Sequence, residues 1–251
     1  MPTGGLRLLW RSLTRHAFGT RSALSICMAM LSADAALAQE IDTARYILPT
    51  TRYDHGVLGD AVEWGGLKLT LTDGRTLHMT LPNSLVFEDI QPRVTDLDGD
   101  GAREVIVVES SLTQGARLSV YNASGRVAST THIGTRNRWL APVGAADLDG
   151  DGHIEIAYID RPHLAKTLRI WRYRDRSLTE VAAHPGLTNH KIGWDFIAGG
   201  IRICGDTPQI ITASGDWSRI VATTFDGSKT ASQEIGRYHG PQSLSAALTC
   251  P

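Results

Sequence analysis

The chain has 251 residues, of which 42% are hydrophobic and 20% are charged. These proportions are ordinary for a globular protein and provide enough apolar material for one sizeable core. The 25 basic and 26 acidic residues give a formal net charge of −1, and no basic stripe runs along the chain, which argues against a nucleic-acid partner.

Residues 1–38 have the three-part pattern of a Sec-type signal peptide. Four arginines precede a short apolar run at residues 23–31, and Ala36-Leu37-Ala38 places small residues where signal peptidase cleaves. The apolar run is too short to span a bilayer as a stable helix. We therefore expect cleavage after Ala38 and a periplasmic or secreted protein with no membrane span. Losing four arginines and one aspartate would leave a net charge near −4.

Short strands with turn signals follow from about residue 50 onward. In residues 67–81, apolar and polar side chains alternate on both sides of Asp73-Gly74, which is the pattern of a β-hairpin. No segment has a sustained helical period, so we predict an all-β fold of antiparallel strands. The hairpin plan recurs at residues 117–129, 167–181 and 219–235.

Two spacings indicate a longer repeat. Asp96 and Asp147 lie 51 residues apart, and Trp139 and Trp194 lie 55 residues apart. Periods in this range are typical of propellers and solenoids. We predict that residues 39–251 form a small β-propeller of about four blades. Each repeat would run through an inner strand, an acidic loop, an apolar strand, a hairpin and a polar link.

Both ends of this array look incomplete. Residues 59–81 supply outer strands without an inner one, whereas residues 243–250 have the pattern of a spare inner strand. We expect this C-terminal strand to pair with the first blade and close the ring, because closure removes exposed sheet edges. Within residues 199–214 the acidic loop has decayed, with Arg202 and Cys204 where aspartates are expected.

The chain contains three cysteines, of which Cys27 lies in the leader and Cys204 and Cys250 remain after its removal. An even pair in an oxidising compartment predicts a disulfide. Such a bond would lock the closing strand to the neighbouring blade. A catalytic thiol is the alternative, although no histidine context singles out either cysteine.

Two acidic loops carry the strongest chemical signal. Residues 96–104 (DLDGDGARE) and 147–155 (DLDGDGHIE) place carboxylates at positions 1, 3, 5 and 9, with glycine at position 6. Solvated acidic turns are the plainer alternative. Oxygen ligands at positions 1, 3 and 5, with a backbone carbonyl at 7, suit Ca²⁺ better than zinc, copper or octahedral magnesium. The predicted ligands of two Ca²⁺ sites are Asp96, Asp98, Asp100, Ala102 and Glu104, and Asp147, Asp149, Asp151, His153 and Glu155.

The flanking sequence decides which kind of calcium loop this is. The bidentate glutamate of an EF-hand would fall on Val107 and Tyr158, in apolar strands rather than helices. The loops instead resemble the FG-GAP or VCBS repeats of integrin α-subunit-like β-propellers, with Glu104 and Glu155 in place of the last aspartate of that family's loop. The resemblance covers two repeats by motif and the others only by strand pattern. It implies bound calcium and an adhesion-like or scaffold-like role.

Several other residues could form functional sites. His190 lies beside Asn189, Lys191 and Asp195 in a polar link, and this group is either a ligand-binding cluster or a turn with a satisfied histidine. His163 and His55 have the same two interpretations. Blade packing and a sugar-binding platform are the alternatives for Trp64, Trp171 and Trp217.

These observations lead to one functional expectation and two alternatives. We expect a monomeric, calcium-binding, non-catalytic interaction module whose partner is an unidentified protein or glycan. A calcium-dependent carbohydrate-binding protein is the first alternative. A hydrolase is the second, and it would need paired carboxylates or a nucleophile–base pair in a cleft.

Overall fold

A computed structural model of the protein describes residues 40–250, so the predicted leader at residues 1–38 lies outside the described residues. The described part contains seventeen strands and one short helix, which confirms the all-β prediction. All strand pairs in its three sheets are antiparallel. Among these residues no helix is long and apolar enough to cross a membrane.

The first sheet joins two groups of strands. One group runs in the order β1-β2-β3 and the other in the order β5-β6-β7-β8, and the short strand β4 pairs with both β2 and β6. The strands are β1 (Ile41–Thr50), β2 (Glu63–Leu71), β3 (Thr76–Thr80), β4 (Leu85–Phe87), β5 (Arg93–Thr95), β6 (Glu104–Ser111), β7 (Gly115–Asn122) and β8 (Gly125–Ser129).

The other two sheets repeat the four-stranded plan. The second runs β9-β10-β11-β12, and the third runs β13-β15-β16-β17, with β14 also paired to β15. Their strands are β9 (Leu140–Ala146), β10 (Glu155–Asp160), β11 (Thr167–Arg174), β12 (Ser177–Pro185), β13 (Leu187–Thr188), β14 (Gly200–Cys204), β15 (Thr207–Ser214), β16 (Arg219–Phe225) and β17 (Thr230–Arg237).

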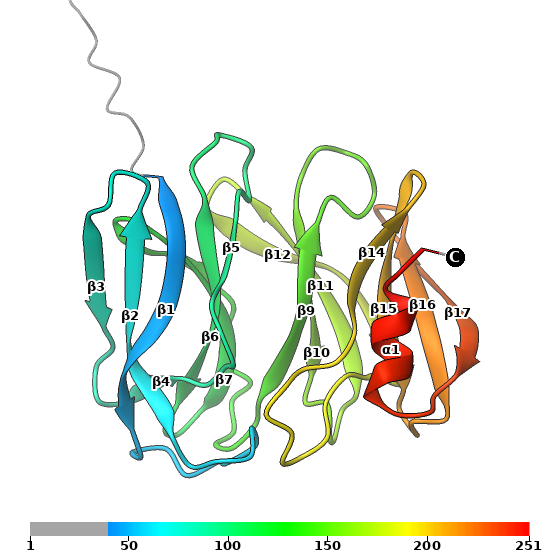
Figure 1. The fold of residues 1–251 in the computed structure, drawn as a ribbon, viewed down its shortest axis with the longest axis horizontal. Helices are drawn as coiled ribbons and strands as arrows, with labels where there is room; N and C mark the ends of the chain where they lie inside the picture. Colours follow the sequence, from blue (N-terminus) through cyan, green and yellow to red (C-terminus); the bar gives the residue numbers. More distant parts are fainter. Residues whose placement is uncertain (1–39, 251) are drawn as a thin grey trace, which may run out of the picture. The chain divides into compact units, whose positions relative to one another are not determined.

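Groups that follow one another in the chain lie side by side (Figure 1). The first strands of successive groups are in contact as β1 with β5 and β9 with β14, and the last strands as β8 with β12 and β12 with β17. The repeat predicted from the 51- and 55-residue spacings therefore corresponds to real strand groups. A closed ring of four blades remains a prediction.

The N-terminal strand β1 corrects one expectation. It pairs along β2 from Ile41 opposite Leu71 to Thr50 opposite Glu63, so the first group already has an inner strand. The prediction missed it because charged and polar residues interrupt its apolar positions: only Ile41 and Tyr46 are buried. A buried face that small leaves a weak alternation in the sequence.

The C-terminal segment corrects a second expectation. Residues Pro241–Ala247 form helix α1, not a strand that closes the ring. A proline in the first turn and the following serine, leucine and alanine residues suit a helix. Its buried Leu244 packs with residues of β15 and β16. The Arg202 guanidinium donates to the Ala247 carbonyl at 2.8 Å.

The predicted disulfide is present. Cys204, at the end of β14, is bonded to Cys250, and their Cα atoms lie 5.6 Å apart. The bond joins a strand to the residues that follow α1, so its partner element differs from the predicted closing strand. The decayed loop of this repeat is a tight turn in which Cys204 pairs with Thr207.

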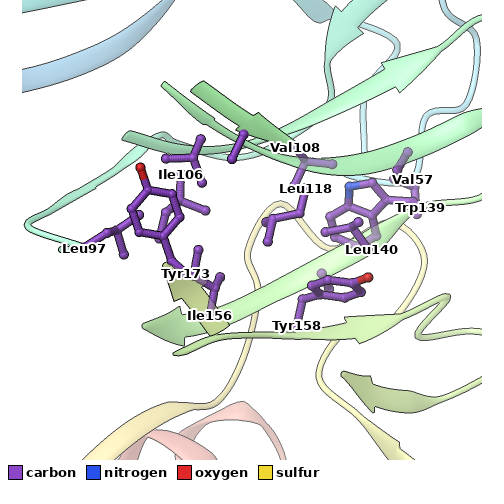
Figure 2. Close-up of a cluster of buried hydrophobic side chains, with 14 residues drawn as sticks. Val57, Leu97, Ile106, Val108, Leu118, Trp139, Leu140, Ile156, Tyr158 and Tyr173 are labelled. Atoms are coloured by element: carbon purple, nitrogen blue, oxygen red, sulfur yellow. The ribbon is translucent and has the colours of Figure 1, made fainter. Parts of the chain in front are cut away.

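The largest cluster of buried side chains lies between the first and second sheets (Figure 2). Residues of β6 and β7 meet residues of β9, β10 and β11 there, and Trp139 is only 2% exposed. The Trp139 indole N–H donates to the Glu88 carbonyl at 2.8 Å. The cluster includes Val57, Leu97, Ile106, Val108, Leu118, Trp139, Leu140, Ile156, Tyr158 and Tyr173.

Candidate metal centre

The first acidic loop connects β5 to β6. The Asp96 carboxylate accepts the amide of Gly99 at 2.8 Å and that of Gly101 at 3.1 Å. Gly101 has φ = 86°, a conformation that side chains other than glycine rarely adopt. One carboxylate at the end of a strand therefore folds the loop back on itself, and glycine permits the turn.

The second acidic loop connects β9 to β10 with the same geometry. Asp147 accepts the amides of Gly150 at 2.7 Å and Gly152 at 2.9 Å. The ninth residue of each loop also has one repeated contact: Glu104 accepts the Leu97 amide and Glu155 accepts the Leu148 amide, both at 2.9 Å. These bonds hold a buried glutamate under each loop.

Three of the predicted side chains converge in each loop. Asp96, Asp98 and Glu104 each offer a carboxylate oxygen, and these three atoms lie within 4.8 Å of one another. The same holds for Asp147, Asp149 and Glu155. Each set of hard oxygen atoms could hold a metal ion.

The aspartates at the fifth position of each loop, which were also predicted as ligands, form hydrogen bonds within their own loops. Asp100 accepts the Ala102 amide at 2.7 Å, and Asp151 accepts the His153 amide at 2.9 Å. Both aspartates are exposed at the tips of the loops. Ligation by the Ala102 and His153 carbonyls remains a prediction.

The carboxylates of the first loop destabilise one another's charge. The pKa of Glu104 is raised to about 7, chiefly by burial and also by the charges of Asp98, Asp100 and Asp96, while the Leu97 amide opposes the shift. Burial and then the charge of Asp100 raise the pKa of Asp98. A bound cation would stabilise the ionised forms of both groups.

Arg172 on β11 distinguishes the second loop from the first. Its guanidinium lies 2.6 Å from Glu155 Oε1, 2.5 Å from Asp149 Oδ2 and 2.8 Å from Asp151 Oδ2. Burial raises the pKa of Glu155, while the Leu148 amide and Arg172 oppose the shift. Sequence reasoning missed this arginine, although the cross-strand register of the hairpin brings it opposite Glu155.

Each acidic loop also lies near a hairpin of the following strand group. Burial and then the charges of Glu104 and Asp98 raise the pKa of Tyr173, which belongs to β11, to about 12. At the second loop, a Cβ atom on Gly227, in the β16–β17 turn, would lie 2.9 Å from Asp149 Oδ2. Each acidic loop therefore lies at the junction between its own strand group and the next one.

Two of the predicted histidines, His55 and His163, line a separate cavity of about 220 Å³. His55, Arg138, Trp139, Arg161 and His163 are among its lining residues. The cavity is partly apolar and receives basic side chains from several segments. It was not predictable from any local motif.

The two histidines beside this cavity form a defined hydrogen-bonded pair. His190 Nε2 lies 3.0 Å from the Trp194 carbonyl and must donate to it, so His190 Nδ1 accepts from His163 Nε2 at 3.0 Å. Burial lowers the pKa of His190, and burial followed by the charge of His190 lowers the pKa of His163 to about 4. Both rings are therefore neutral at neutral pH.

His55 belongs to another buried group. Its Nδ1 lies 2.5 Å from Glu88 Oε1, and the Ser110 hydroxyl donates to the other oxygen of Glu88. Burial raises the pKa of Glu88, and the hydrogen bonds from His55 and Ser110 oppose the shift. The carboxylate lies between serine and histidine, so the histidine is not placed to deprotonate this serine.

The rest of the predicted Asn189–Asp195 cluster diverges. Asn189 is buried and its Nδ2 donates to the Ala141 carbonyl at 3.3 Å, whereas Asp195 is exposed. Lys191 Nζ lies over aromatic rings, 4.7 Å from the centroid of Trp217. The residues of this segment therefore do not form one site: Asn189 packs inside the protein, and Asp195 faces solvent.

The three tryptophans that could have formed a sugar-binding platform lie in three different apolar clusters. Trp64 packs in the first sheet, Trp171 beside the cluster of Figure 2, and Trp217 near β15 and β16. The Trp171 indole also donates to the Tyr158 hydroxyl at 3.1 Å. These positions favour the packing interpretation.

The fold and site together define an all-β chain of repeated strand groups with acidic loops at their junctions. Residues 96–158 match the profile of the FG-GAP-like repeat. This segment spans both acidic loops, so the predicted FG-GAP repeat is confirmed. No curated protein matches the chain.

Proposed function

We propose that this chain is a non-catalytic FG-GAP β-propeller of about four blades that acts as an interaction module. The observation that carries the proposal is the convergence of three carboxylates in acidic loops at junctions between strand groups. Its partner is a protein outside the cytoplasm. The leader pattern supports a periplasmic or secreted location, which N-terminal sequencing of the exported protein tests: Gln39 should be the first residue.

Calcium is the ion that this proposal assigns to the loops. Asp96, Asp98 and Glu104 would hold it in the first loop, and the ion would supply positive charge to a buried glutamate. Its role is structural, because the strands on either side of the loop are fixed by the ligands they contribute. Loops of this type in extracellular modules bind Ca²⁺ with Kd of roughly 10⁻⁴–10⁻³ M.

Thermal unfolding tests the calcium assignment. We expect millimolar Ca²⁺ to raise the Tm of the chelated protein, and Asp98→Asn to reduce that rise because it removes one converging carboxylate of the first loop. Asp206→Asn is the matched control, since Asp206 is exposed in the shortened loop of a later repeat. An identical melt in Ca²⁺ and in EDTA would refute a structural calcium site.

Glycan binding is the second candidate function. The cavity lined by His55, Arg138, Arg161 and His163 favours it, because hydrogen-bonding and cationic groups converge there on a partly apolar surface. A glycan array with Arg138→Ala as the control variant tests this candidate. Glycan binding that persists unchanged in the variant would place the binding surface elsewhere.

A further inference from the structure

The two acidic loops have matching backbones but different countercharges. The first aspartate and the glutamate of each loop accept the same amides, with distances that agree within 0.2 Å in each pair. In the second loop, Arg172 contacts three carboxylates. In the first loop, none of the four carboxylates has an ion-pair partner among residues 40–250.

Strand register identifies the residue of the first repeat that corresponds to Arg172. Tyr121 pairs with Val105 on β6, and Trp171 pairs with Ile156 on β10. Asn122 therefore occupies the position of Arg172. Its Oδ1 accepts the Ser124 amide at 2.8 Å, so this side chain serves its own hairpin turn.

The arginine that belongs to the first loop, Arg103, forms ion pairs with residues outside that loop. Arg103 Nη2 lies 3.2 Å from Glu40 Oε1 and 3.7 Å from Asp42 Oδ1, at the start of β1. Glu104 is 5% exposed and accepts one amide, that of Leu97. A buried, ionised carboxylate without a countercharge is costly, and a bound cation would remove that cost.

We propose that Arg172 is the built-in cation of the second loop, so that the chain binds one divalent cation, at the first loop, and none at the second. Ca²⁺ needs its carboxylate oxygens at 2.3–2.6 Å. The three guanidinium nitrogens already lie at hydrogen-bonding distance from Asp149, Asp151 and Glu155. A divalent ion would have to displace them, because two cations cannot share these oxygens without strong repulsion.

This inference rests on the proposed calcium function for the first loop, while its claim about Arg172 concerns the second loop alone. It replaces two equivalent Ca²⁺ sites with one metal site and one arginine site. Because Arg172 is a permanent cation, the contact between the second loop and the following strand group does not depend on calcium. The contact between the first loop and the strand group that follows it does depend on calcium.

Isothermal titration of the chelator-treated, desalted protein with CaCl₂ tests the inference. We expect one Ca²⁺ per wild-type chain. Asp98→Asn should weaken binding at least ten-fold, whereas the matched change Asp149→Asn in the second loop should leave both stoichiometry and affinity unchanged. Arg172→Asn, which introduces the residue of the first repeat, should add a second site.

Thermal unfolding of Arg172→Asn gives an independent readout. Without calcium this variant should melt below the wild type, and calcium should restore more of its Tm than it adds to the wild type. If Arg172→Asn does not fold, the wild-type stoichiometry and Asp149→Asn decide the question.

The outcomes of these titrations separate the role of Arg172 from the calcium function of the first loop. Two Ca²⁺ per wild-type chain, or weaker binding in Asp149→Asn, would overturn the role of Arg172. No binding by the wild type together with one site in Arg172→Asn would support that role and refute the calcium function of the first loop. No binding by either protein would overturn both.

Discussion

Buried carboxylates in this protein are stabilised in contrasting ways. Glu109 is fully buried and lies against Arg117 and, at 3.1 Å, Arg126. Glu63 is 2% exposed and has no ion-pair partner among the described residues. Burial, followed by the negative charges of Glu88 and Asp60, raises the pKa of Glu63 to about 9. The fold therefore keeps Glu63 protonated at neutral pH.

Glu63→Gln should change how stability depends on pH. The unfolded chain releases the Glu63 proton near pH 4.5, but the folded protein keeps it until about pH 9. The stabilising effect of this proton is complete below about pH 4.5 and is lost as pH rises towards 9. Glutamine does not ionise, so the variant should gain stability over wild type between pH 5 and pH 8, by up to about 1.4 kcal/mol per pH unit.

Urea unfolding of both proteins at pH 5 and pH 8 measures this gain. Glu234→Gln is the control, because Glu234 lies on β17 and is exposed beside Arg219 of β16. The change in stability that this control causes should be nearly the same at both pH values. An equal stability difference for Glu63→Gln at the two pH values would show that Glu63 ionises normally in the folded protein.

At the scale of single elements, the chain ends in helix α1 where its sequence predicts a strand. Leu244 is its buried residue, Arg202 bonds its last turn, and the Cys204–Cys250 disulfide fixes the residues beyond it. A seven-residue helix is too short to be stable alone. It persists because these contacts hold it against β14, β15 and β16.

Removing the disulfide should therefore loosen this end of the third sheet. The bond closes a loop of 46 residues, and the loss of such a disulfide typically costs about 2–4 kcal/mol. Denaturation of the Cys204→Ser/Cys250→Ser variant measures the loss, and hydrogen exchange should show faster exchange in α1 and β14. Reductant should lower the stability of wild type but not of the double variant. Equal stability of the oxidised wild type and the variant would contradict this role.

At the scale of the whole described chain, the apolar clusters join separate sheets. The cluster of Figure 2 takes residues from the first and second sheets, and another takes Ile159 and Ile170 of the second with Ile210 and Val221 of the third. Sheets that share core residues lose contacts together. The described part of the chain should therefore unfold in one cooperative step.

Trp139→Ala should lower stability without splitting that step. Trp139 is nearly fully buried and joins the second sheet to the Glu88 carbonyl, so its loss should cost about 3–5 kcal/mol. Ile192→Ala is the control: this side chain is 72% exposed, and its loss should cost less than about 0.5 kcal/mol. Denaturant unfolding followed by circular dichroism measures both values, and two separated transitions in the wild type would contradict shared cores.

The features that were predictable depend on residues close together in the chain. Alternating apolar residues around Asp73-Gly74 predict the β2–β3 hairpin, and the structure pairs Leu67 with Met79 there. The acidic loops form because Asp96 and Asp147 bond amides three and five residues ahead. The cysteine pair was predictable only because the leader pattern left two cysteines.

Other features depend on contacts between distant segments. The all-β class, the hairpins, the repeat and its acidic loops could be predicted because they follow from local periodicity and turn chemistry. Three other features became known only from the folded chain: β1 completes the first group, α1 ends the chain, and one cavity is lined by both His55 and His163. The tertiary structure also decided that Arg172 fills one loop and not the other, because a guanidinium's partners are set by strand register and packing.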